Sequence, residues 1–202
     1  MAGRKAEWSG WRSREIQVSG SIGGGPVQVP GGGSGTPLLV ESRGDLTSSF
    51  EIVSVRAGSY HQRAHSPIAA LHRRGPSRFV LPADCDAFRV CRVRTREGAG
   101  GFSRWRARLI EPDALPPLTS EERTGKGTET FGHFEAKLYR EHARALYYDF
   151  VDAPGTVICT PANGAPQMVR HTSAADQKGV LRLPQHGYVT VSADGRWKVS
   201  SR

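Results

Sequence analysis

The sequence predicts an all-β fold of two related antiparallel β-sandwich-like units behind a basic N-terminal arm. Three observations support this class. The 24 glycines and 13 prolines among 202 residues indicate many turns. Short runs in which apolar and polar residues alternate recur along the chain, as in strands with one buried face. One such pattern near the end of the sequence also returns, in looser form, in the first half.

The clearest alternation lies in residues 181–199. Apolar residues at 181 and 183, at 189 and 191, and at 197 and 199 each enclose one polar residue. Pro184 and Gly187 separate the first two runs, and Asp194-Gly195 is typical of a tight hairpin turn. The segment therefore predicts three strands joined by turns.

Residues 1–14 form the basic arm. They carry Trp8 and Trp11 without periodicity, and two exposed indoles favour docking of the arm on the body or on a partner. A glycine-rich loop, 19–35, follows with one edge strand at 27–29. The first unit is predicted to span 15–110, with 59–76 as a surface loop. Its strands are expected at 15–18, 38–41, 50–55, 78–81, 88–93 and 105–109.

Residues 111–130 are predicted to be a Pro-rich acidic linker, because four acidic residues and three prolines fall within 111–127. The second unit then spans 131–202. Within it, 134–150 contains good helix formers but also alternates and is rich in aromatic residues. Strands are favoured there, because the repeat requires them.

The two halves share an ordered series of short elements across about 70 residues. Each series has a Leu-Pro strand end, an aromatic-led alternating strand and an Arg-Trp strand. Trp105 and Trp197 are expected to anchor one core each. The matched segments are 79–82, 88–90 and 104–109 in the first half, and 181–184, 188–191 and 196–199 in the second.

The closing segment also resembles a known type of domain. Leu183-Pro184, the run 188–191 and Ala193-Asp194-Gly195-Arg196-Trp197 are similar to small β-sandwich domains, often in tandem, of uncharacterised actinobacterial proteins. Those domains close with an Ala-Asp-Gly-x-Trp strand. The first half departs from this, with Gly100-Gly101-Phe102-Ser103-Arg104-Trp105 at the corresponding place. The resemblance implies a fold and no activity.

The charge balance indicates possible partners. Lys and Arg number 28 against 19 Asp and Glu, which gives a net charge of +9. Such an excess favours polyanions, although basic residues can also simply solvate a surface. Arginines two apart on a strand share a face, so a cationic stripe is expected on the first unit. The possible polyanion-binding residues are Arg4, Lys5, Arg12, Arg14, Arg73, Arg74, Arg92, Arg94, Arg96, Arg104, Arg106 and Arg108.

No catalytic, cofactor-binding or metal-binding residues are assigned. His61 and His65 are four apart, but Ser66-Pro67 disfavours a helix and arginines surround them. Gly125-Lys126-Gly127-Thr128 lacks the P-loop ending. The three cysteines contain no C-x-x-C and are predicted to be reduced, as in the cytoplasm. No run is long enough for a transmembrane helix, and residues 1–20 lack the apolar core of a secretory signal.

These observations predict a non-catalytic binding or structural module that contacts a protein partner or assembly through its loops and N-terminal arm. The alternative is a nucleic-acid or other polyanion-binding protein that uses the arginine-rich strand face. A second alternative is an enzyme whose site is not recognisable from the sequence. No cofactor is expected.

Overall fold

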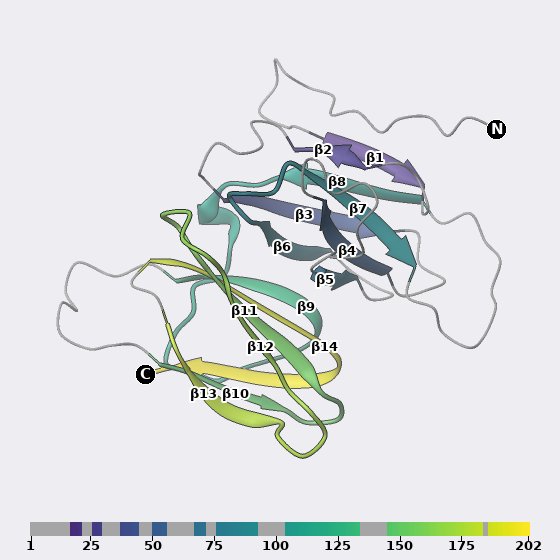
Figure 1. The fold of residues 1–202 in the computed structure, drawn as a ribbon. Coiled ribbons are helices and arrows are strands. Elements are labelled where there is room, and N and C mark those ends of the chain that lie inside the picture. Colours follow the sequence, from purple (N-terminus) through teal and green to yellow (C-terminus); the bar gives the residue numbers. More distant parts are fainter. Residues whose placement is uncertain are drawn as a thin grey trace. The chain divides into compact units, whose positions relative to one another are not determined.

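The computed structural model describes residues 17–21, 26–29, 37–44, 50–55, 67–71, 76–92, 104–133, 145–183 and 186–202. The chain divides into two compact units, Met1–Ile110 and Glu111–Arg202. The described residues form β-strands and one short 3-10 turn, so the all-β prediction is confirmed (Figure 1). The basic arm, residues 1–14, lies outside the described residues.

The first unit contains two four-stranded antiparallel sheets, ordered β1-β8-β3-β6 and β2-β7-β4-β5. The first strand thus pairs with the last and the second with the last but one, which is the pairing order of a jelly roll. Its strands are β1 (Gln17–Ser21), β2 (Val27–Gln28), β3 (Leu38–Gly44), β4 (Phe50–Val55), β5 (Pro67–Leu71), β6 (Ser77–Leu81), β7 (Ala87–Arg92) and β8 (Arg104–Leu109).

One strand of the first unit falls where the sequence predicts a surface loop. Pro67–Leu71 forms β5 and pairs with β4 at the edge of its sheet. Ile68 is buried in the core of the unit, which explains why this short apolar patch is ordered as a strand. Pro67 is tolerated because the strand begins there and lies at an edge. The surface-loop prediction is therefore wrong for 67–71.

The second unit is built from one six-stranded antiparallel sheet that folds over on itself. Its order is β12-β11-β14-β10-β13, and β9 pairs along β14. The elements are η1 (Pro112–Ala114), β9 (Arg123–His133), β10 (Ala145–Phe150), β11 (Gly155–Pro161), β12 (Met168–His171), β13 (Lys178–Arg182) and β14 (Gly187–Ser201). The expected linker, 111–130, thus includes η1 and the first part of β9. Within the ambiguous segment, 145–150 is a strand, and 134–144 lies outside the described residues.

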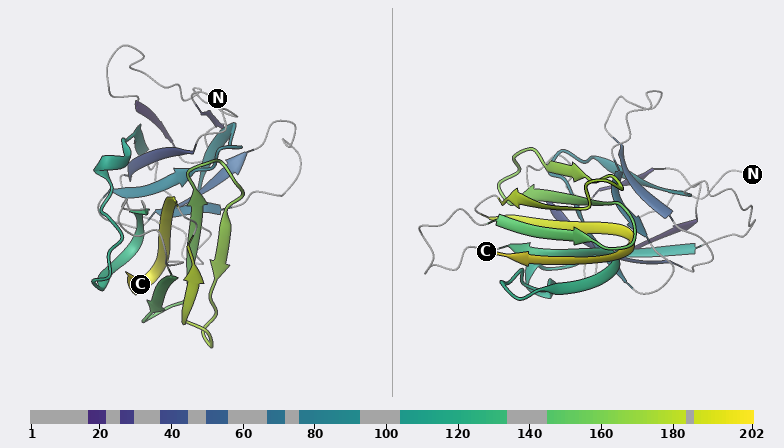
Figure 2. Two further views of the ribbon diagram at one scale, coloured as in Figure 1. Left: turned by 90° about the vertical axis from the view of Figure 1, so that its left-hand side faces the viewer. Right: turned by 90° about the horizontal axis from the view of Figure 1, so that it is seen from below.

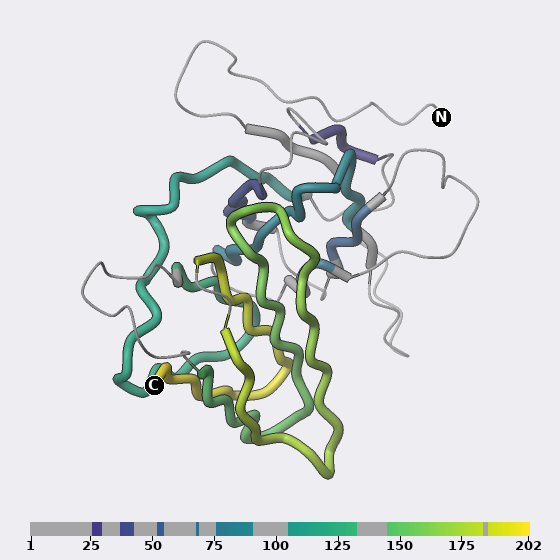
Figure 3. The backbone as a smooth tube through the Cα atoms, turned by 60° about the vertical axis from the view of Figure 1, so that its left-hand side comes forward, coloured from purple at the N-terminus to yellow at the C-terminus, as the bar shows by residue number. Residues whose placement is uncertain are grey.

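The long strand β14 bends at Asp194 and Gly195. Its first part pairs with β11 and its second part with β10, and the register against β9 shifts between Ala193 and Arg196. The predicted hairpin turn at Asp194-Gly195 is therefore wrong, because these residues form a β-bulge within one strand. Figure 2 shows β14 in yellow as a strongly curved strand, and its path can be followed in Figure 3.

Each unit has its own apolar core. In the first, Trp105 packs against Phe88 at 5.9 Å between ring centroids. In the second, Trp197 meets Phe131 edge-on, also at 5.9 Å. Both cores are filled by side chains of the strands that enclose them. The second core consists of Leu118, Phe131, Leu146, Tyr148, Phe150, Val157, Cys159, Leu183, Val189, Val191, Ala193, Trp197 and Val199.

The two units share one strand order when they are compared by pairing. The two parts of β9 correspond to β1 and β2, and the two parts of β14 correspond to β7 and β8. Between them, β10, β11, β12 and β13 correspond in order to β3, β4, β5 and β6. In this comparison Trp105 lies opposite Gly20, and Trp197 lies opposite Gly125. A duplication predicts such agreement, and the common origin of the halves stays a prediction.

Candidate functional site

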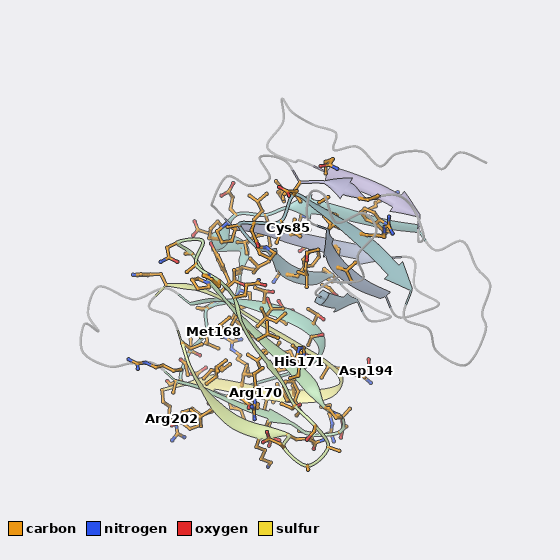
Figure 4. All side chains as sticks on the ribbon, in the orientation of Figure 1. Cys85, Met168, Arg170, His171, Asp194 and Arg202 are labelled. Atoms are coloured by element: carbon orange, nitrogen blue, oxygen red, sulfur yellow. The ribbon has the colours of Figure 1, made fainter. Side chains whose placement is uncertain are left out.

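Strand β12 is an edge strand with an exposed outer side. Within the described residues it pairs only with β11, from Thr156 opposite His171 to Cys159 opposite Met168. All four residues of β12 are exposed, including 38% of Met168 and 49% of Val169. Figure 4 labels Met168, Arg170 and His171 along this strand. The unpaired backbone of an edge strand can accept a further strand.

Hydrogen bonds hold β12 in place despite its exposure. Arg170 Nε donates to the hydroxyl of buried Tyr148 at 3.4 Å, and Arg170 Nη2 donates to Asp176 Oδ2. The hydrogen bond with Tyr148 raises the pKa of Arg170 above its usual value. The hydroxyl of Thr156 and Nδ1 of His171 lie 3.0 Å apart. The strand is therefore fixed to the rest of the unit, with its outer side open.

A second candidate surface is the outward face of β13, β10 and β14, which we call the basic face. Tyr147 lies opposite Val180 of β13 and Ser200 of β14, and Asp149 lies opposite Lys178 and Lys198. These side chains line an open hollow of about 390 Å³. Tyr147 is 39% and Val180 is 57% exposed. The hollow therefore combines an accessible aromatic ring with charged groups.

Ion pairs neutralise some of the cations on the basic face. Lys178 Nζ lies 2.9 Å from Asp149 Oδ2, and Lys198 Nζ lies 3.3 Å from Glu122 Oε1. Arg196 pairs with Asp152 at the bend of β14. Three further cations, Lys126, Arg182 and Arg202, form no ion pair with a described carboxylate. The guanidinium carbon of Arg202 lies 5.2 Å from the centre of the Tyr147 ring.

The arginine stripe predicted on the first unit is described only in part. Trp105 and Ala107 of β8 are buried and Arg106 is exposed, which agrees with the expected alternation. Arg108 Nη2, however, lies 3.1 Å from Glu41 Oε1, a carboxylate of β3 that also pairs with Arg78. Much of the charge of Arg108 is therefore compensated within the sheet.

The other predicted polyanion-binding residues contribute nothing to this description. For Arg92 and Arg104 only the positions at the end of β7 and the start of β8 are described. The remaining eight lie outside the described residues: Arg4, Lys5, Arg12, Arg14, Arg73, Arg74, Arg94 and Arg96.

Neither surface of the second unit was predicted from the sequence. No strand is predicted at Met168–His171, which shows no regular alternation. The cations of the basic face come from three strands and from the residue that follows β14. Two signals lie within single strands: Lys178 and Arg182 share a face of β13, and Arg196 and Lys198 share a face of β14.

Cys85 and Cys159 are buried and form no disulfide. Cys159 is completely buried, and this burial raises the pKa of its thiol to about 12. Buried Cys85 donates a hydrogen bond from Sγ to the carbonyl oxygen of Ala87 at 3.1 Å. Among the described residues, no three His, Cys, Asp or Glu side chains gather where they could hold a metal ion. His61 and His65 are outside this part of the chain. No helix in the described ranges is long and apolar enough to cross a membrane.

Comparison with known proteins gives no family. No family model matches the sequence, and no curated protein matches it. Among solved structures, the chain is similar to a conserved protein of unknown function from Pseudomonas aeruginosa PAO1. The identity is 12%, the TM-score is 0.26, and the match covers 93% of this chain and 81% of that one. The resemblance to tandem actinobacterial sandwich domains stays a prediction.

Proposed function

We propose that the chain is a non-catalytic binding module for a protein partner or assembly, and that strand β12 is its docking edge. The partner contributes an extended segment that adds to the sheet beside β12. Main-chain hydrogen bonds give such strand addition its affinity, and alternate side chains give it specificity. Contacts by the N-terminal arm and loops, expected from the sequence, concern residues outside the described ranges.

The observation that carries this proposal is the exposure of all four residues of β12 at the end of the sheet. Edge strands in isolated proteins are commonly protected by inward charges, bulges or a covering segment. Here Met168 and Val169 add apolar surface to the open edge, as suits a partner that covers them.

The filled cores support binding over catalysis. Large aromatic and aliphatic side chains occupy the interior of both sandwiches, for example Phe88 in the first and Phe150 in the second. A ligand therefore has to meet the outer surface of either unit. Small-molecule sites are usually concave and enclosed, whereas the β12 edge is a linear backbone surface of the kind that peptides use.

Affinity capture from native extract after nuclease treatment tests the proposal. The baits are the unchanged chain, Val169→Lys, and Val180→Lys as a matched control. Both valines are exposed and lie on edge strands of the same sheet. Neither substitution buries a charge, so both variants should melt within a few degrees of the unchanged chain.

We expect Val169→Lys to lose proteins that the unchanged chain and Val180→Lys both retain, because a charge on the strand opposes strand addition. Equal recovery by all three baits would contradict the proposal. So would loss with Val180→Lys alone, which would place the docking edge at β13.

A further inference from the structure

We propose that the basic face binds single-stranded nucleic acid, with Tyr147 as the stacking platform for a base. This goes beyond the proposed function, because it concerns another surface of the second unit and another class of ligand. The β12 edge and the basic face can therefore be tested by separate substitutions.

The first step of the argument is charge. Six cations are carried by the outward side of β9, β13 and β14 or directly follow it, against four nearby carboxylates, which leaves an excess of 6 − 4 = 2 positive charges among these side chains. Electrostatic attraction to phosphates supplies most of the sequence-independent affinity for nucleic acids. The cations are Lys126, Lys178, Arg182, Arg196, Lys198 and Arg202, and the carboxylates are Glu122, Asp149, Asp152 and Asp194.

The second step is the placement of two cations that have no ion pair with a described carboxylate. Arg182 lies opposite Ala145 on one side, and Arg202 exchanges both backbone hydrogen bonds with Ala145 on the other. Their Cα atoms are thus about two strand spacings, or 10 Å, apart. Arg182 and Arg202 therefore flank Ala145 from its two neighbouring strands, so one phosphate can be approached from both sides.

The third step is the aromatic ring. Tyr147 lies two residues along β10 from Ala145, about 7 Å away on the same face. Its neighbours across the strands, Val180 and Ser200, are small, and the residue is 39% exposed. The guanidinium carbon of Arg202 lies 5.2 Å over the centre of the ring, so a base can stack on the outer side of the guanidinium or take its place on the tyrosine. The proposed binding sites for the phosphate and the base of one nucleotide are therefore adjacent.

The hollow favours a single strand over a duplex. Its volume of about 390 Å³ lies around Tyr147, and the bases of a duplex are stacked inside the helix where this ring cannot reach them. An acidic peptide could use the same cations but would gain little from the ring. The contribution of Tyr147 therefore distinguishes the two ligands.

The test is a fluorescence-anisotropy titration with labelled oligothymidylate over a range of salt concentrations, with labelled poly-glutamate in parallel. The variants are Arg182→Ala/Arg202→Ala, Tyr147→Leu and Tyr147→Phe. The matched control is Arg123→Ala, because Arg123 is exposed on the same sheet but lies opposite core residue Val199, on the other face. All these positions are solvent-accessible, and a thermal melt confirms folding.

We expect the double arginine variant to bind oligothymidylate more weakly and to lower the slope of log affinity against log salt by about 0.7, since each neutralised phosphate of a single strand accounts for about 0.7 and the two arginines share one phosphate. Tyr147→Leu should lose about tenfold in affinity for oligothymidylate and none for poly-glutamate, while Tyr147→Phe should retain binding. Arg123→Ala should retain both affinity and slope.

Three results would overturn the proposal. One is absence of oligothymidylate binding at low salt by the unchanged chain. Another is an unchanged slope in the double arginine variant. The third is equal weakening of both ligands by Tyr147→Leu, which would indicate an acidic protein segment instead. None of these three results bears on the proposed β12 edge. That edge is tested with Val169→Lys and Val180→Lys in extract from which nuclease has removed nucleic acid.

Discussion

The indole of Trp197 lies directly over Gly125 on the neighbouring strand. A Cβ atom at Gly125 would come within 2.3 Å of Cζ2 of that ring. The same indole donates a hydrogen bond from Nε1 to the carbonyl oxygen of Gly127 at 3.0 Å. Gly127 has a φ of 82°, a conformation that favours glycine. The glycines of β9 thus make room for the ring that anchors the second core.

We expect Gly125→Ala to destabilise the second unit by about 1–3 kcal/mol, because the methyl group must displace a fully packed indole. Denaturant unfolding followed by tryptophan fluorescence measures the change. Thr124→Ala, at the exposed neighbouring position, is the control and should stay within about 0.5 kcal/mol of the unchanged chain. Equal stability of the two variants would show that Trp197 is loosely packed.

The stabilisation that the Arg196–Asp152 ion pair gives to the bend of β14 should decrease at low pH. Arg196 donates from Nε to Asp152 Oδ2 at 2.8 Å and from Nη2 to Oδ1 at 3.0 Å. These bonds lower the pKa of Asp152 from 3.8 to about 2. Because the folded pKa is depressed, the stabilisation is fully present above pH 3.8 and is lost as the pH falls to about 2.

Asp152→Asn should therefore be less stable than the unchanged chain at neutral pH, and the difference should narrow between pH 3.8 and about 2. Denaturant unfolding across this range provides the measurement. Glu121→Gln, at an exposed position before β9, serves as the control for removing one carboxylate. A difference that persists unchanged at pH 2 would contradict the ion-pair explanation.

The first unit should depend on Glu41. The residue is 6% exposed, and its carboxylate accepts hydrogen bonds from Arg78 Nε at 3.4 Å and from Arg108 Nε at 3.2 Å. Glu41→Gln removes the charge that both guanidiniums share, so we expect a loss of about 1–3 kcal/mol in denaturant unfolding. Arg106→Ala, at an exposed position on β8, should change little. A stability of Glu41→Gln within about 0.5 kcal/mol of the unchanged chain would show that the two ion pairs contribute little net stability.

The hydroxyl groups of the two adjacent tyrosines of β10 should contribute differently to the free energy of unfolding. Tyr148 is 5% exposed and its hydroxyl accepts a hydrogen bond from Arg170, whereas Tyr147 is 39% exposed. Tyr148→Phe should cost about 0.5–1.5 kcal/mol, and Tyr147→Phe close to none. Thermal unfolding of both variants compares them. The reverse order would contradict the assignment of Tyr148 as the residue that fixes β12.

Several strands of the second unit were predictable because one face is buried, but the first part of β9, 123–130, was expected to be linker. The alternation around Leu181, Val189 and Trp197 identifies parts of β13 and β14 correctly. The bulge at Asp194-Gly195 was not predictable, because the same dipeptide is typical of hairpin turns. Its conformation depends on Asp152, whose partner Arg196 lies 44 residues further along the chain.

The candidate surfaces could not be predicted from local sequence. The basic face exists because strand pairing brings Arg182, Lys126 and Arg202 onto one sheet from distant positions. In the first unit, local alternation correctly places Arg106 and Arg108 on one face. It could not indicate that Glu41, 67 residues away, compensates Arg108.

Hydrogen–deuterium exchange on the complex recovered by affinity capture tests the docking edge most directly. Exchange is followed in the chain alone and with the captured partner, segment by segment. We predict slower exchange for Met168–His171 when the partner is bound, and unchanged exchange for β13 at the opposite edge. Protection of Lys178–Arg182 with no change at Met168–His171 would contradict the proposal that β12 receives the partner.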